Sequence, residues 1–163
     1  MELGTLAVAA IGAVFGVGTT LVTDLVRSRR EQDRYWNETK RIVYTRFLTS
    51  LAQTHSRMIV AAFREQSEDV RRHGVHDAFH NDPQYSDAKS VLRELAISAP
   101  DHVYQAALPV YQQLRVVREI LAAQPLRPES AEYEEVRQPF FRGMETLQRV
   151  MRDDLQPSTS RRL

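Results

Sequence analysis

The hydrophobic pattern divides the chain into an uncharged N-terminal stretch and a longer region of helical periodicity. From Leu3 to Thr23 no residue is charged, and these 21 positions would form a helix of about 30 Å, the thickness of the hydrocarbon core of a bilayer. The stretch also lacks the polar face that an amphipathic surface helix would show. The pattern therefore predicts a transmembrane anchor over residues 1–26, with a buried helix of a soluble protein as the alternative.

Basic residues flank the predicted anchor on one side. Arg27, Arg29, Arg30 and Arg34 follow it and no Lys or Arg precedes it, so the positive-inside rule places the N-terminus outside and the C-terminal domain in the cytoplasm. The acidic start at Glu2 argues against a cleaved signal peptide. The four arginines either attract anionic lipid headgroups of the cytoplasmic membrane or act only as a topology signal.

Small residues recur within the anchor at intervals of four. Gly12, Gly16 and Thr20 form a ridge on one face of a helix, and such a ridge lets two helix backbones approach closely in a membrane. The spacing favours self-association through this face, although it also occurs by chance in apolar helices.

Residues 27–155 are predicted to form a cytoplasmic bundle of about four helices, followed by a flexible tail at 156–163. The first helix has an apolar stripe at steps of four and seven, which makes all of its members candidate core residues: Trp36, Val43, Phe47, Leu51, Met58 and Ala62. We expect this helix to break at Gly74 and the next to start at Asp82-Pro83, an N-cap residue followed by proline.

Two further helices complete the predicted bundle. The stretch SAPD, with Ser98 as cap and Asp101 three residues later, resembles a capping box that opens the third helix. Pro109 is expected to kink this helix or to displace its start. The third helix carries a heptad-like seam, and the fourth has a comparable face: Val103, Ala107, Val110, Leu114, Val117 and Leu121, then Tyr133, Val136, Phe140, Met144, Leu147 and Met151. The predicted fold class is therefore all-α, and the seam packs either within one chain or between chains.

Composition narrows the possible partners. The formal net charge of +1 gives no global reason to expect nucleic-acid binding. The chain has no cysteine, which excludes disulfides and thiolate metal sites. No phosphate loop, nucleophile elbow or other enzyme signature occurs. We therefore expect neither catalysis nor a cofactor, and no small-molecule substrate can be identified from the sequence.

One cluster could still carry chemistry. On a helix, His73, His76 and His80 would share a face, and with Asp77 they could hold zinc or nickel. The pair His76-Asp77 is also similar to the central motif of HD-type phosphohydrolases, with His55 and either Asp101 or Asp153 as possible outer ligands. The alternative is a set of solvated histidines in a polar connection.

The order of segments supports a family resemblance. An apolar N-terminal helix, the exit RSRREQDRYW, then LRELAISAPDHVYQAALPVY and the closing YEEVRQPFFRGMETLQRVMRDDL resemble small single-pass membrane proteins of GC-rich Gram-positive bacteria and their phages. The resemblance implies a membrane-anchored helical domain and supplies no catalytic residues to carry over.

These patterns lead to three hypotheses of function. The first is an interaction module at the cytoplasmic membrane face that binds a protein partner or forms a homo-oligomer. The second is a membrane-active effector, of phage or defence type, that oligomerises through its anchor. The third is a metal-dependent enzyme built on the histidine cluster.

Overall fold

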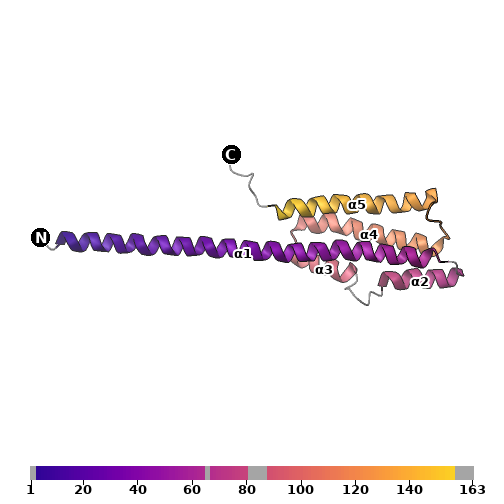
Figure 1. Ribbon diagram of the computed structural model, residues 1–163, viewed down its shortest axis with the longest axis horizontal. Helices are drawn as coiled ribbons and strands as arrows, with labels where there is room; N and C mark the ends of the chain where they lie inside the picture. Colours follow the sequence, from indigo (N-terminus) through magenta and orange to yellow (C-terminus); the bar gives the residue numbers. More distant parts are fainter. Residues whose placement is uncertain (1–2, 65–66, 81–87, 157–163) are drawn as a thin grey trace. The chain divides into compact units, whose positions relative to one another are not determined.

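The computed structural model is helical and confirms the predicted all-α class. It describes the backbone of residues 3–64, 67–80 and 88–156, and the side chains of the same residues except 3–30, 32 and 33. No strand occurs among these residues. The helices are α1 (Leu3–Ala62), α2 (Glu68–His80), α3 (Ala88–Ser98), α4 (Asp101–Ala123) and α5 (Ala131–Leu155) (Figure 1).

The chain divides into two compact units, Met1–Thr39 and Lys40–Leu163. The described part of the first unit is the N-terminal portion of α1. Trp36 in this unit is 49% exposed, so the prediction that it joins the core was wrong. Its position continues the apolar stripe of α1, but the helices that bury the stripe belong to the second unit.

No helix is long and apolar enough to cross a membrane among the residues that the structure describes. The backbone of the predicted anchor is helical from Leu3 onward, and its side chains lie outside the described part of the chain.

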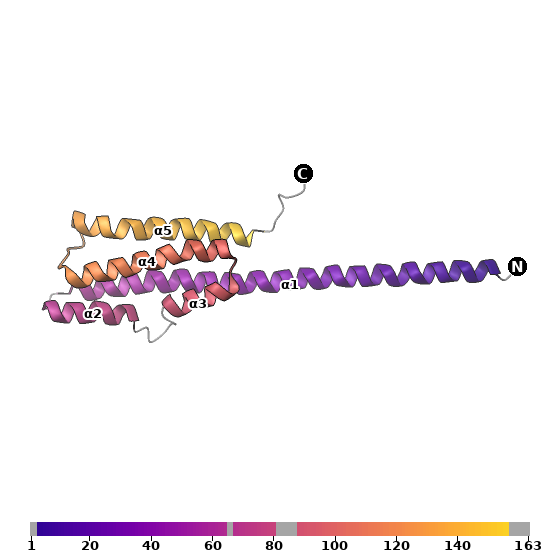
Figure 2. The same ribbon diagram turned by 180° about the vertical axis from the view of Figure 1, so that it is seen from behind.

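The second unit is a helical bundle. Helix α4 contacts α2, α3 and α5, and Figures 1 and 2 show α5 on the opposite side of α4 from α2 and α3. The C-terminal part of α1 pairs with α5 in antiparallel fashion: Lys40 meets Asp154 near the C-terminus of α5, whereas Phe63 meets Tyr133 near its N-terminus. Among the described residues the bundle thus contains five helices, where about four were expected.

The core confirms the predicted periodicity. All six seam positions of α4 are buried, with at most 4% of each residue exposed, so this seam packs within one chain. Most of the predicted stripes of α1 and α5 are buried too: Val43, Phe47, Leu51, Met58, Ala62, Tyr133, Phe140, Met144, Leu147 and Met151. Val136 is partly buried against the same core.

The additional helix is α2, which passes through Gly74 instead of breaking there. A Cβ built at Gly74 would lie 3.6 Å from Cβ of Ala61, an ordinary contact distance, so a small side chain would also fit between α2 and α1. Val75 and Phe79 of α2 are buried and supply the apolar contacts that stabilise this helix. The predicted start at Asp82-Pro83 falls in 81–87, outside the described residues.

One local prediction on α4, the capping box at the start of the helix, was wrong, and one of the two alternatives for Pro109 does not hold. Its N-cap is Pro100, without a side-chain cap, and the Ser98 hydroxyl donates instead to the carbonyl oxygen of Glu94 in the preceding turn. Pro109 does not displace the start of the helix, which begins at Asp101. The buried seam on both sides of Pro109 offsets the hydrogen bond that the proline removes.

Candidate functional site

The predicted histidine cluster lies on α2, and its side chains have other neighbours. The Nδ1 atom of His73 lies 2.8 Å from the carbonyl oxygen of Asp69, one turn earlier. The Nε2 atom of His80 lies 3.3 Å from a terminal nitrogen of Arg118 on α4. Among the side chains that the structure describes, no group of three or more His, Asp or Glu could hold a metal ion.

His55 lies in the core between α1 and α5. Its ring stacks on Phe140 at a centroid distance of 5.1 Å and meets Phe141 edge-on at the same distance. Burial, together with the nearby positive charge of Arg137, lowers the pKa of His55 to about 4. This environment favours a neutral ring in an aromatic stack, which is a structural arrangement.

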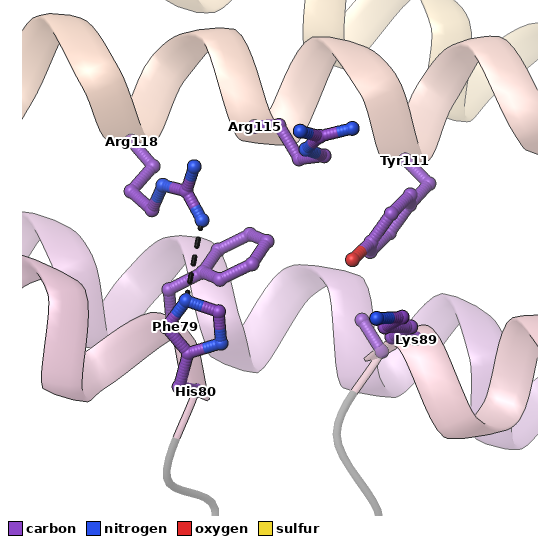
Figure 3. Close-up of a pocket in the computed structure, with 7 residues that line it drawn as sticks. Phe79, His80, Lys89, Tyr111, Arg115 and Arg118 are labelled. Carbon is purple, nitrogen blue, oxygen red and sulfur yellow. Dashed lines mark hydrogen bonds between the residues drawn. The ribbon is translucent and has the colours of Figure 1, made fainter.

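A cationic pocket forms where His80 meets α4. We use this name for a cavity of about 340 Å³ lined by Phe79, His80, Ala88, Lys89, Tyr111, Arg115 and Arg118. The end of α2, the start of α3 and one face of α4 supply its walls (Figure 3). The α4 residues are spaced four and three apart, which aligns them on the face next to the core seam.

Arg118 is the most buried charged residue of the cationic pocket, with 11% of its side chain exposed. Its guanidinium lies 4.5 Å from the centre of the Phe79 ring, within range of a cation–π interaction. Arginine has no acceptor, so it must donate to Nε2 of His80, which places the imidazole hydrogen on Nδ1. The other terminal nitrogen donates to Glu119, whereas the buried Nε has no hydrogen-bond partner among the described atoms.

The electrostatic balance of the pocket is positive. Lys89, Arg115 and Arg118 line it, and no carboxylate does so among the described residues. Glu119 lies beside the pocket with 60% of its side chain exposed. The hydrogen bond from Arg118 lowers the pKa of Glu119, and that carboxylate offsets part of the positive charge. The arrangement is suited to binding an anion.

Sequence reasoning singled out His80 but missed the rest of the pocket. Lys89, Arg115 and Arg118 each look like members of a solvated helix face, because nothing in their spacing connects α3 to α4. The available signal was the position of Arg118, which directly follows the core residue Val117 and precedes Leu121 by three. A charged residue beside the core seam of α4 becomes buried when other helices pack against α4 on both sides of that seam.

A second cavity, of about 430 Å³, lies between α4 and α5. Both helix-interior prolines, Pro109 and Pro139, line it, together with Gly143. A Cβ at Gly143 would lie 3.2 Å from Cγ2 of Val110, so a larger residue would require Val110 to shift by a few tenths of an ångström. The feature is explained by helix packing.

Most of the remaining predicted site residues have side chains that the structure does not describe. These are the small residues Gly12, Gly16 and Thr20 and the arginines Arg27, Arg29 and Arg30. Arg34 is described and is exposed.

Comparison with known proteins found no matching family model, no matching curated protein and no matching solved structure.

Proposed function

We propose that the protein is a membrane-anchored helical module that acts by binding, either to itself or to a protein partner, at the cytoplasmic face of the membrane. One observation carries the proposal. A single helix, α1, contains both the uncharged stretch from Leu3 to Thr23 and the buried core positions Phe47 and Leu51. The uncharged stretch and the first core positions of the bundle thus belong to the same helical element.

The residues around the uncharged stretch support this orientation and mode of action. Arginines at 27, 29, 30 and 34 follow it directly, as expected where a helix leaves the membrane on the cytoplasmic side. The Gly12, Gly16 and Thr20 ridge supports pairing of two such helices. Exposed apolar side chains on the bundle, Ile97 at 88% and Val70 at 54%, provide further contact positions for a partner.

Alkaline-carbonate extraction tests the anchor. Membranes from cells that express the full chain with a C-terminal tag are compared with membranes from cells that express a version lacking residues 1–26. We expect the full chain to stay in the pellet until detergent is added, because an apolar helix buried in lipid is not released by high pH, and the shortened chain to be soluble. Release of the full chain by carbonate would contradict the proposal.

Self-association is tested with bulky substitutions on the ridge. Gly12→Ile with Gly16→Ile should shift the detergent-solubilised protein to a smaller oligomer in size-exclusion chromatography with light scattering, because the side chains separate the helix backbones. Gly18→Ile is the matched control, since helical periodicity places Gly18 away from the ridge. An unchanged oligomer in the ridge variant would leave a separate protein as the partner.

A further inference from the structure

We propose that the cationic pocket binds the phosphate group of a small molecule. The inference is independent of membrane anchoring, because every residue that carries it belongs to the bundle. It concerns the side chains of His80, Lys89, Arg115 and Arg118 around a cavity of about 340 Å³ (Figure 3).

The first support is the state of Arg118. Only 9% of the residue is exposed, and an arginine does not lose its charge on burial. A buried charge is stable only when it is paired and its donors are satisfied. The buried Nε of Arg118 has no partner, and its ionic partner Glu119 lies largely in solvent. The guanidinium lines the cavity, so a phosphate bound there would give its charge a partner inside the cavity.

The second support is the combination of charges around the cavity. Lys89 of α3 and Arg115 of α4 line the same cavity as Arg118, so two exposed cations share it with the buried one. Like charges around one cavity repel, and no carboxylate lines the described walls to compensate. A dianion placed among the three cations replaces this repulsion with attraction, whereas a neutral ligand would not.

The third support is the volume of the cavity and the two aromatic residues in its lining. Phe79 and Tyr111 are buried aromatic residues that border the charged groups, so a ligand with a carbon skeleton would contact both kinds of surface. The volume is at the small end of the range of about 300–1,000 Å³ for ligand sites. A phosphorylated small molecule fits these dimensions better than the continuous backbone of a nucleic acid.

Two sources of the same chemistry are tested separately. The full chain in detergent is titrated with inorganic phosphate at constant ionic strength, and thermal unfolding is followed by circular dichroism. In a second experiment, the purified full chain is incubated with vesicles of phosphatidylcholine alone or of phosphatidylcholine with added phosphatidic acid. The amount of protein bound to each kind of vesicle is measured. A ligand that binds only the folded state raises the unfolding temperature.

The test variant combines Lys89→Gln with Arg115→Gln, because both side chains are exposed and their removal leaves the core intact. Arg127→Gln with Arg149→Gln is the matched control, with the same change in net charge at exposed positions that line neither cavity. We expect the test variant to bind phosphate at least about tenfold more weakly, as loss of charge-assisted hydrogen bonds implies, and the control to bind normally.

Each outcome decides the proposal. A shift with inorganic phosphate that the test variant loses and the control keeps supports a soluble phosphate ligand. Binding to phosphatidic acid vesicles alone, with the same dependence on Lys89 and Arg115, supports a lipid headgroup as the source. If phosphate acts no more strongly than chloride and the vesicle compositions are bound equally by all variants, the pocket does not recognise phosphate.

Discussion

Two buried charges in the bundle have opposite surroundings. The carboxylate of Asp154 on α5 is 9% exposed and accepts hydrogen bonds from Nζ of Lys40 at 3.1 Å and from the Tyr44 hydroxyl at 2.8 Å. His102 lies 3.8 Å from its other oxygen. The guanidinium of Arg118 is similarly buried, but it faces a cavity, other cations and a largely exposed carboxylate.

The difference separates a structural charge from a candidate binding group. Asp154 joins the start of the bundle portion of α1 to the end of α5, and its countercharge and hydrogen-bond donors are all supplied by the chain. Arg118 retains an unsatisfied buried donor, which costs stability in the absence of a ligand. Burial of a charge alone therefore does not identify a site; the missing partner together with the open space does.

The largest expected effect is at the satisfied charge. Asp154→Asn should lower the free energy of unfolding by about 3 kcal/mol, because it leaves the partly buried Lys40 ammonium without its countercharge. Urea denaturation followed by circular dichroism measures the change. Asp153→Asn is the control, since Asp153 is exposed and should change stability by less than about 0.5 kcal/mol. Equal effects at both positions would contradict the structural role of Asp154.

His55 tests whether an unsatisfied buried nitrogen alone marks a binding group. Its Nε2 has no hydrogen-bond partner among the described atoms, yet it lines neither cavity and packs between aromatic rings. The folded-state pKa of about 4 lies below the ordinary value of 6.5, so the unfolded state takes up the proton first as the pH falls. Stability from the neutral ring is complete above pH 6.5 and is lost between pH 6.5 and about 4.

The corresponding measurement is the free energy of unfolding against pH. The wild-type chain should lose about 2 kcal/mol more than His55→Gln between these pH values, because the variant has no ring to protonate. His73→Gln, at an exposed position, should retain the wild-type pH dependence. A pH dependence that survives in His55→Gln would mean that another group is responsible.

The same contrast shows how much the sequence could predict. The seam of α4 and the apolar face of α5 follow from periodicity, because burial along a helix repeats every three or four residues. The exposure of Trp36 could not be predicted, since a periodic apolar stripe does not show where along a helix burial ends. The cationic pocket required Lys89 and Arg118 to meet from separate helices, and no local pattern contains that tertiary contact.

An intermediate change in the free energy of unfolding is expected on α2, the helix that contributes His80 to the cationic pocket. Gly74→Ala should raise the free energy of unfolding by about 0.5–1 kcal/mol, because alanine favours a helix and the added Cβ meets Ala61 at an ordinary contact distance of 3.6 Å. Gly143→Ala is the comparison, since its Cβ would lie only 3.2 Å from Val110 and should gain less. Urea denaturation of both variants measures the difference. A loss of stability in Gly74→Ala would indicate that α2 and α1 pack more tightly than described.

The smallest expected effect on stability is at the unsatisfied charge itself. Arg118→Met keeps a long flexible side chain in the core, removes the buried unpartnered donor and leaves Glu119 in solvent, so the free energy of unfolding should change by less than about 1 kcal/mol. The same variant should lose the stabilisation by phosphate that the wild-type chain shows. Urea denaturation with and without inorganic phosphate measures both quantities. A loss of stability as large as that of Asp154→Asn, already present without phosphate, would mean that Arg118 stabilises the fold as Asp154 does, and the distinction between the two charges would not hold.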